Sequence, residues 1–472
     1  MTRGVDADYL VIGAGASGMA FADALTAHAD VQVALVDRRH GPGGHWLDAY
    51  AFVRLHQASS FYGVASTMLG SGSIQSHGPE AGLYERARAT EVCAYYDRVL
   101  NEQLLPSGRI EFHPSCEYLG GGTFVSRVSG QSYQARPGCR IVDARYLAPE
   151  IPATTPPPFD VAEGTRVISV NRLPRLESAP EEFVIVGAGK TATDACVWLL
   201  EGGVDPDSIR WVRPREPWML NRAVVQPDPA VFIGAAADIM EAAPAAVSPE
   251  DLFLRMEAAG VMLRIDRSAT PAMAKTPTLA QWELDLLRGI ERVIRLGHIR
   301  GIEPGRIELD AGDVAISRGA LVVHCAASGL QYPPLIPIWG EEAITIQPVR
   351  AGFPCFGAAL IGYVEATRDD DAEKNRVCRP SPLSNTPSDW MRMQVLGGLS
   401  ARTFNSEPDI REWANRVALN PARISPGHAP SDELEAAERR FGAAFGSGVN
   451  AMADLGGLGT HDLSGAAARH AN

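Results

Sequence analysis

A glycine-rich turn between a strand and a helix, close to the N-terminus, constrains the fold of this chain more than any other feature. Residues 9–12 predict a short buried strand, and residues 31–36 predict a second apolar strand that ends in Asp37. Between them, a helical pattern follows a turn with the spacing G-x-G-x-x-G. This order of elements is typical of a Rossmann-like unit that binds a dinucleotide. The unit supplies the first set of expected cofactor-binding residues: Gly13, Gly15, Ala16, Ser17, Gly18, Asp37 and Arg38.

Each position of this turn has a mechanical role in dinucleotide binding. Gly13 permits the tight turn, Gly15 lets the backbone approach a pyrophosphate, and Gly18 lets the helix pack closely on the sheet. The helix N-terminus offers free N–H groups to the phosphates, and Asp37 can accept a hydrogen bond from a ribose hydroxyl. The alternative is a fortuitous glycine turn that binds no nucleotide, and the two flanking strands and the acid disfavour it.

A second unit of the same kind lies near the middle of the chain. Residues 182–186 predict a strand, a G-x-G-x-x-A turn and a helix follow, and residues 209–212 predict the next strand. This strand ends in Arg213 rather than in an acid, and an arginine there can pair with a ribose 2′-phosphate, which favours NADPH over NADH. The alternatives are a duplicated unit that binds nothing and arginines that are surface cations. The expected cofactor-binding residues here are Gly187, Gly189, Lys190, Thr191, Ala192, Arg213 and Arg215.

Composition narrows the class of protein. The 472 residues include 46% hydrophobic and 21% charged residues, enough for a large core, and the net charge of −13 disfavours nucleic acid and polybasic membrane binding. The seven cysteines contain no C-x-x-C pair, so we expect no metal site and reduced thiols in the cytoplasm. No apolar run is long enough to span a membrane. A homo-oligomer is compatible with the sequence.

The chain order predicts an α/β fold with two Rossmann-like dinucleotide-binding domains, the NADP domain inserted into the FAD domain, and a helical C-terminal region. A proline-rich stretch at residues 149–158 cannot be helix or central strand and suggests a boundary. The expected helices outside the glycine-turn units cover residues 248–260, 279–296, 353–365 and 432–445. The expected domain ranges are 1–175 (FAD domain), 176–320 (NADP domain with a helical insertion), 321–370 (return to the FAD domain) and 371–472 (helical region with a tail that frays from residue 446).

Four motifs together resemble the class B flavin-dependent monooxygenases, which include flavin-containing, N-hydroxylating and Baeyer–Villiger enzymes. The motifs are VIGAGASG with Asp37, GGHW at residues 43–46, GAGKTATD with Arg213, and CAASG at residues 325–329, and the resemblance covers about residues 8 to 365. It implies FAD at the first glycine turn and NADPH at the second. It also implies that the flavin passes Gly44, His45 and Trp46, and that Ser328 and Gly329 form the turn resembling the family's A-T-G.

The resemblance also suggests two candidate catalytic residues. Residues 50–56 (YAFVRLH) can be laid on the Tyr-Pro-Gly-x-Arg-x-Asp stretch of the Baeyer–Villiger enzymes, which places Arg54 on the arginine and His56 on the aspartate. Arg54 could contact the flavin or a substrate anion, and His56 could donate a proton near neutral pH. The chain departs from the family in three ways. It lacks the F-x-G-x-x-x-H fingerprint before the second glycine turn, His56 replaces an acid, and Ser328 replaces a threonine.

The expected function is an FAD-dependent, NADPH-using oxidoreductase that monooxygenates a small organic molecule through reduced flavin and O₂. Residues 45–66 would form one wall of a dry, aromatic cleft, although for Phe52 and Phe61 the core interpretation is favoured. A helix at residues 353–365 would point its N-terminus at the flavin or be a plain buried helix. Two alternatives stay open: an NADPH-dependent reductase or dehydrogenase without oxygen insertion, and a non-catalytic FAD-containing binding or sensor protein. Disulfide reductases share the architecture but need a redox cysteine pair, which is missing here.

Overall fold

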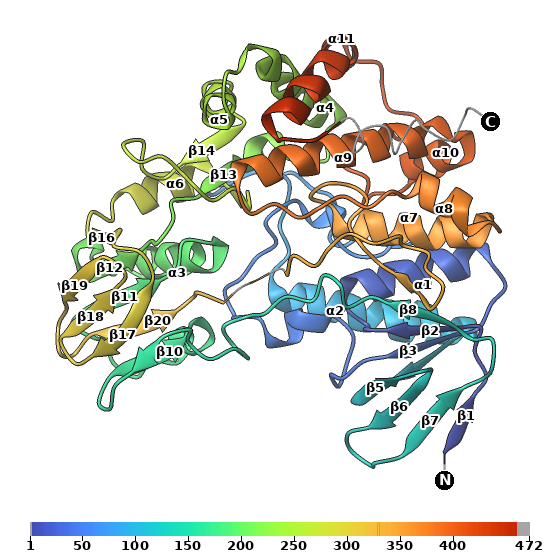
Figure 1. Cartoon of the computed structure of the whole chain (residues 1–472), viewed down its shortest axis with the longest axis horizontal. Coiled ribbons are helices and arrows are strands. Elements are labelled where there is room, and N and C mark those ends of the chain that lie inside the picture. Colours follow the sequence, from blue (N-terminus) through green and yellow to red (C-terminus); the bar gives the residue numbers. More distant parts are fainter. Residues whose placement is uncertain (1, 328, 330, 460–472) are drawn as a thin grey trace.

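The computed structural model describes residues 2–327, 329 and 331–459 and builds the first unit on a five-stranded parallel sheet (Figure 1). The strand order is β21-β8-β2-β3-β4, with every neighbouring pair parallel. The predicted strand, turn, helix and strand therefore lie at the centre of this sheet. Its elements are β2 (Tyr9–Ile12), α1 (Ala16–His28), β3 (Val33–Val36), α2 (Ala89–Val99), β4 (Ile110–His113), β8 (Arg140–Asp143), β21 (Ala343–Thr345) and α7 (Pro354–Thr367).

The two faces of this sheet are covered differently. On one face α1 packs against α7, and the helices cross so closely that a Cβ added to Gly362 would lie 2.5 Å from the Phe21 carbonyl oxygen. The other face packs on the four-stranded sheet β1-β7-β6-β5, because Leu10 and Ile12 point to it while Val11 points to the helices. The strands of this second layer are β1 (Arg3–Val5), β5 (Cys116–Gly120), β6 (Thr123–Ser126) and β7 (Ser132–Ala135).

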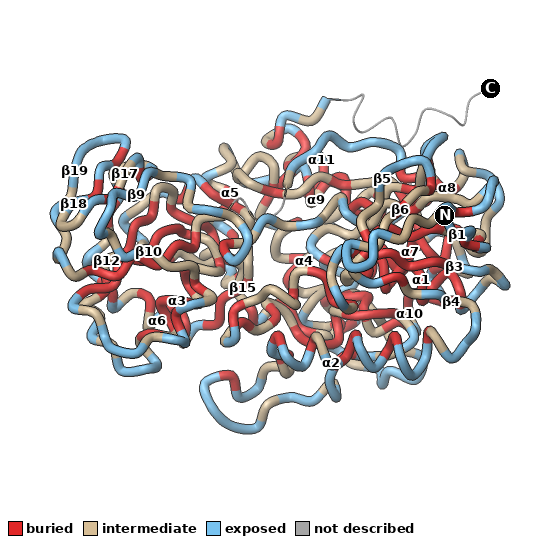
Figure 2. The backbone as a smooth tube through the Cα atoms, turned by 90° about the horizontal axis from the view of Figure 1, so that it is seen from below, coloured by how far each residue is buried: buried red, intermediate tan, exposed pale blue. Residues whose placement is uncertain are grey.

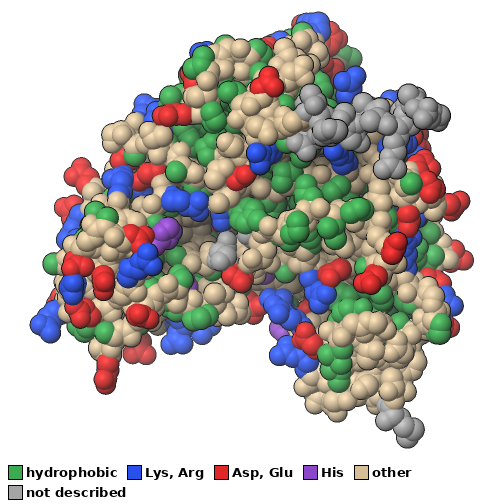
Figure 3. Space-filling model, viewed as in Figure 1, with side chains coloured by type: hydrophobic (Ala, Val, Ile, Leu, Met, Phe, Trp, Pro, Cys, Tyr) green, Lys and Arg blue, Asp and Glu red, His purple; other side chains and the backbone are tan. Residues whose placement is uncertain are grey.

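The second unit repeats this plan. Its parallel sheet has the order β10-β20-β11-β12-β16, and the sheet β19-β18-β17-β9 packs on it through a separate apolar core. The elements are β9 (Asp160–Val161), β10 (Arg166–Ser169), β11 (Phe183–Val186), α3 (Lys190–Glu201), β12 (Ile209–Val212), α6 (Gln281–Arg288), β16 (Val293–Ile294), β17 (Ile299–Glu303), β18 (Arg306–Leu309), β19 (Gly312–Ala315) and β20 (Leu321–His324). Figure 2 shows buried residues concentrated around these two sheets, and Figure 3 shows a notch between the two lobes.

A third region joins an insertion of the second unit to the C-terminal helices. Helices α4, α5, α9 and α11 share one apolar core, whose largest side chains include Trp218, Phe253 and Trp390. The elements are β13 (Trp218–Asn221), α4 (Pro229–Ala242), α5 (Pro249–Ala258), β14 (Met262–Arg264), β15 (Thr278–Leu279), α8 (Asp371–Val377), α9 (Pro387–Ser406), α10 (Pro408–Arg416) and α11 (Asp432–Leu455). None of the described helices is long and apolar enough to cross a membrane.

The predicted fold class is confirmed, but the domain limits need correction. β20 (Leu321–His324) pairs with β10 and β11, so it belongs to the second unit and not to the returning first unit. The chain returns to the first sheet only at β21, which pairs with β8. The second unit also begins earlier than residue 176, since β9 and β10 already belong to its sheets.

Two helix predictions were wrong in extent. The expected helix over residues 279–296 is α6, which ends at Arg288, followed by strand β16; a short apolar run such as Val293–Ile294 fits a helix or a strand equally by periodicity. The helix expected at residues 432–445 continues to Leu455 as α11, so the chain does not fray from residue 446. Its small residues permit close packing: a Cβ on Gly448 would lie 2.6 Å from the Met240 carbonyl oxygen of α4.

Candidate functional site

One cavity of about 1720 Å³ runs past both glycine turns and into the third region. Pockets for a single drug-sized ligand have volumes of about 300–1,000 Å³, so this cavity has room for more than one molecule. The expected site residues that line it are Gly13, Gly15, Ala16, Ser17, Asp37, Arg38, Gly44, His45, Trp46, His56, Gly187, Gly189, Lys190, Thr191, Arg215 and Gly329.

The first glycine turn has the geometry that its spacing predicts. Gly13 has a φ of 108°, which favours glycine, and a Cβ on Gly18 would lie 1.8 Å from the Gly13 carbonyl oxygen. Gly18 therefore packs α1 against the turn and does not line the cavity. A Cβ on Gly15 would lie 3.5 Å from the Gly44 Cα, so residues 13–18 and the GGHW segment approach each other closely and both border the cavity.

Asp37 closes this turn. Its carboxylate accepts hydrogen bonds from the backbone N–H groups of Ala14, at 2.7 Å, and Arg39, at 2.8 Å. The side chain is nearly buried and lines the cavity beside the N-terminus of α1, whose N-cap residue Gly15 supplies no side chain to cover the free N–H groups. The arrangement offers N–H donors for a diphosphate and an acceptor for a ribose hydroxyl.

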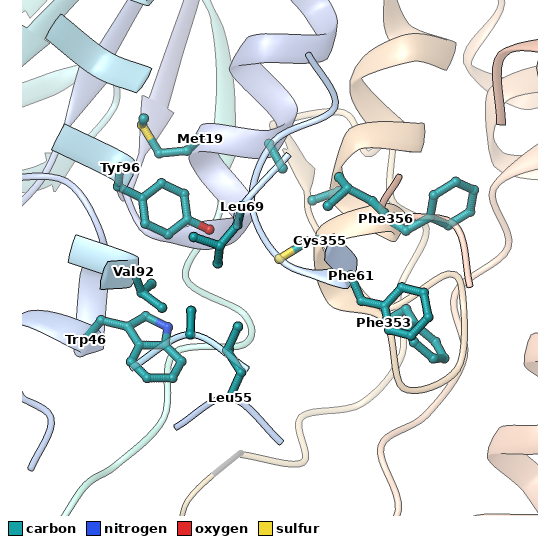
Figure 4. Close-up of a cluster of buried hydrophobic side chains, with 14 of the residues drawn as sticks. Met19, Trp46, Leu55, Phe61, Leu69, Val92, Tyr96, Phe353, Cys355 and Phe356 are labelled. Atoms are coloured by element: carbon teal, nitrogen blue, oxygen red, sulfur yellow. The ribbon is translucent and has the colours of Figure 1, made fainter. Parts of the chain in front are cut away.

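An aromatic wall borders the cavity next to this turn. The Trp46 Nε1–H donates a hydrogen bond to the Tyr62 hydroxyl at 2.6 Å, and the two rings meet edge-on with centroids 5.7 Å apart. Figure 4 shows Trp46 beside Leu55, with Phe61 and Phe353 forming a second aromatic pair. Phe61 is buried and absent from the cavity lining, which fits the core interpretation of that residue. Burial and then the Arg39 charge lower the pKa of His45 to about 4.

The second glycine turn repeats the geometry of the first and adds a buried lysine. Gly187 has a φ of 125°, and Gly189 is the N-cap of α3. The Lys190 ammonium group forms an ion pair with Asp194 and lies 3.4 Å from Glu283. Ala192 is fully buried against the sheet and does not line the cavity. Tyr50 of the first unit donates a hydrogen bond to Asp194 at 2.7 Å, so the second turn is tied to the first unit.

The two arginines after β12 have different surroundings. Arg213 is buried, its guanidinium carbon lies 4.6 Å from the Trp211 ring centroid, and its Nε forms an ion pair with Glu216 at 3.3 Å. It does not line the cavity, contrary to the expectation. Arg215 does line it, and its Nη2 donates to Asn385 at 3.2 Å. Of the two arginines, only Arg215 therefore borders the cavity.

The two candidate catalytic residues are not brought together in the expected way. Val53, Leu55 and His56 line the cavity, but Arg54 between them does not, and its backbone forms an isolated antiparallel bridge with Arg88. His56 does line the cavity, yet burial and the positive charges of Lys190 and Arg222 lower its pKa to about 3. A pKa of about 3 makes His56 a neutral imidazole near pH 7.

After burial itself, a buried ion network between the two units contributes to the low pKa of His56. Arg222, with no exposed surface, donates to Glu80 at 2.7 Å, to Glu283 at 2.6 Å and to the His56 carbonyl oxygen at 3.1 Å. Burial alone would raise the pKa of Glu283, but the charges of Lys190, Arg222 and Arg86 outweigh burial and lower it to about 2. Sequence reasoning missed this network, since none of Glu80, Arg222 and Glu283 belongs to a motif.

Two further expectations have different outcomes. Ser328 lies outside the described residues, while Gly329 lines the cavity and forms an isolated bridge with Glu150.

The seven cysteines are all free, and burial, then the Asp194 charge, raises the pKa of Cys325, which borders the cavity. A protonated, buried thiol is a poor nucleophile. The described residues contain no cluster of His, Cys, Asp and Glu that could hold a metal ion.

Comparison of the sequence with known proteins identifies a family. The protein of Mycobacterium tuberculosis (strain H37Rv) named "Uncharacterized protein Rv2000" is 42% identical over 419 residues, which cover 88% of this chain and 78% of the relative. The chain belongs to the Rv2000 family. Residues 11–61 also match a family model described as an NAD(P)-binding Rossmann-like domain, and this range contains the first glycine turn and the GGHW segment.

Solved structures offer more distant similarities. The NADP⁺-bound cyclohexanone monooxygenase from Rhodococcus sp. Phi1 has a TM-score of 0.43 and 15% sequence identity, with 96% of this chain and 98% of that chain covered. The bacillithiol disulfide reductase from Staphylococcus aureus has a TM-score of 0.41 and 10% identity, with 86% and 100% covered. A likeness of this degree assigns no function to this chain.

Proposed function

We propose that this member of the Rv2000 family is an FAD-dependent, NADPH-using oxidoreductase whose reaction is the monooxygenation of a small organic molecule. The observation that carries the proposal is the cavity of about 1720 Å³, which passes the N-termini of α1 and α3 at the two glycine turns. A hydride can pass between two cofactors only when both reach one enclosed space. FAD, when bound, would accept a hydride from NADPH and pass electrons to O₂.

The residues at the first turn fit the FAD assignment. Gly15 and Gly44 bring two backbone segments together at the edge of the cavity, where a Cβ on Gly44 would lie 3.0 Å from the Gly15 Cα, and a diphosphate would bind along this backbone. The free N–H groups at the start of α1 would stabilise the diphosphate charge, and Asp37 would accept a hydrogen bond from the ribose. Trp46, held by its hydrogen bond to Tyr62, would shield the reacting ring from water.

The residues at the second turn would position the nicotinamide cofactor. The N-terminus of α3 would hold its diphosphate, and Arg215 would pair with the ribose 2′-phosphate. His56, neutral at pH 7, would orient a cofactor or substrate group by a hydrogen bond rather than by proton transfer. Arg54, which does not line the cavity, would act indirectly by positioning the segment that carries His56.

The runner-up is an NADPH-dependent reductase that inserts no oxygen. The missing F-x-G-x-x-x-H fingerprint favours it. Under either function we propose a cytoplasmic location, and the seven free thiols are consistent with that reducing compartment.

The test separates these functions by the fate of oxygen. Flavin-loaded protein is mixed with NADPH under ¹⁸O₂ and a panel of ketones, thioethers and amines, and the products are examined by mass spectrometry. Incorporation of ¹⁸O supports the monooxygenase. NADPH oxidation that yields only hydrogen peroxide, with every compound, supports the reductase, and the absence of flavin reduction by NADPH would contradict both.

A further inference from the structure

The cavity has a third arm that neither glycine turn explains. Helices α4, α9 and α11 line it with large apolar side chains, among them Phe232, Ile239, Trp390, Met393, Phe441 and Phe445. No phosphate-binding turn and no free helix N-terminus that either cofactor would need lies among these helix segments. The arm is therefore free for a third molecule, which a two-cofactor oxidoreductase requires as its substrate.

Small residues on facing helices create the space in this arm. Gly398 and Ala401 of α9 and Gly442 of α11 all border the cavity. A Cβ on Gly398 would meet the Phe445 ring at 3.8 Å, which is ordinary contact, and a Cβ on Gly442 would meet nothing within 4 Å. The width of the arm thus depends on residues that could be larger without backbone conflict, which provides a direct steric test.

Arg350, between β21 and α7, also borders the cavity beside the arm. Its guanidinium carbon lies 5.8 Å from the centroid of the Phe232 ring, and among the described residues its side chain forms no ion pair and no hydrogen bond. Burial lowers the pKa of Arg350 to about 10, with no neighbouring carboxylate to oppose the effect. The group still carries its charge at pH 7, and a desolvated cation is costly unless an anion pairs with it.

The exposed part of the cavity lining favours anions as well. Among the exposed residues of α9, α10 and α11 that border the cavity, Arg402 and Arg411 are cations and Glu438 is the one acid. On a chain with a net charge of −13, a local excess of positive charge draws anionic ligands toward this opening.

We propose that this arm binds the substrate of the oxidoreductase, and that the substrate is an organic acid: an apolar chain or ring system between α4, α9 and α11, with a carboxylate paired to Arg350. The inference rests on the proposed function, since it assigns the two glycine turns to cofactors. Arg350 lies two residues before Gly352, whose carbonyl oxygen accepts a hydrogen bond from Gln57 in the segment that carries His56. The acid group would accordingly bind where the arm joins the wall of the flavin site.

The experiment measures binding alone, with oxidised, flavin-loaded protein and no NADPH. Decanoate and its neutral analogue decanamide are titrated and followed by isothermal calorimetry. Wild type should bind decanoate at least ten-fold more tightly than decanamide. In Arg350→Met the affinity for decanoate should fall about ten- to a hundred-fold, the range for a hydrogen-bonded charge pair, with decanamide unchanged. Arg350→Lys should keep part of the preference.

A steric pair of variants tests the position of the apolar part. Gly442→Leu should weaken both ligands at least ten-fold, whereas Ala443→Leu, at the next residue, which does not line the cavity, should change neither. The proposal is wrong if wild type binds decanoate and decanamide equally. It is also wrong if Arg350→Met leaves the affinity for decanoate unchanged, even where the flavin content of the variant changes. Failure of the proposed function shows separately, as protein that holds no flavin or is not reduced by NADPH.

Discussion

Removing the guanidinium group of Arg222 should destabilise the protein far more than removing a surface arginine. Arg222 has no exposed surface and pairs with Glu80 at 2.7 Å and Glu283 at 2.6 Å. Breaking a buried pair by deleting one partner costs about 3–5 kcal/mol, because the remaining charge is left without compensation. In Arg222→Met, Glu80 would keep its ion pair with Arg86, and Glu283 would keep its ion pair with Lys190. We therefore expect the variant to lose unfolding free energy near the lower end of this range, about 3 kcal/mol.

The assay is urea unfolding, with the free energy compared at equal m-values. Arg255→Met is the control, because Arg255 pairs with Asp251 at 3.0 Å on the exposed face of α5 and should cost less than about 1 kcal/mol. Adding Glu283→Gln to Arg222→Met removes one uncompensated charge, so the double variant should lose less than the two single losses combined. If Arg222→Met and Arg255→Met lose the same free energy within error, or if the double variant is additive, the network does not hold the units as argued.

Three other predictions concern separate residues. Because the folded pKa of His56 is about 3 and the unfolded value about 6.5, the unfolded state binds the extra proton between these values. Wild type should therefore lose about 2 kcal/mol more stability than His56→Gln when the pH falls from 7 to 5; equal losses would refute the low pKa. Gly448→Leu should lower the free energy of unfolding by about 1–3 kcal/mol through its clash with Met240, whereas Gly446→Leu should leave it nearly unchanged. Thermal unfolding measures both, and equal effects would contradict the close packing of α11 on α4. Arg215→Ala should lower the NADPH-over-NADH preference in flavin reduction about ten-fold, and an unchanged ratio would remove Arg215 from the site.

The two glycine turns could be predicted because their signal is local. In each turn, a few adjacent residues determine the backbone conformation. They place Gly15 against Gly44 in the first turn and make Gly189 the N-cap of α3 in the second. The expected neighbouring strands of each sheet follow from chain order. The same reasoning placed β20 in the wrong sheet, since a buried apolar strand carries no mark of its partner. The overlay that proposed Arg54 matched residue types but could not show which side chains of an extended segment face the cavity.

The ion network and the third arm could not be predicted, since both depend on residues distant in sequence. Glu80, Arg222 and Glu283 meet only after two units and an insertion have packed together. The glycines of α11 looked like signs of fraying, because composition alone does not distinguish small residues that loosen a helix from those that let it approach another. Arg350 carried no motif, and its significance comes from the lack of any acid near it among the described residues.

The flavin content of a matched pair of glycine variants tests the central claim most directly. Gly15→Val places its side chain against Gly44 in the first turn, and Gly189→Val places the same side chain at the equivalent position of the second turn, where a Cβ meets nothing within 4 Å. We expect wild type and Gly189→Val to hold about one FAD per chain by absorbance, with Gly189→Val no longer reduced by NADPH. Gly15→Val should fold, by circular dichroism, but hold less than a tenth of that flavin. Full flavin content in Gly15→Val, or loss of flavin only in Gly189→Val, would contradict the assignment of FAD to the first turn.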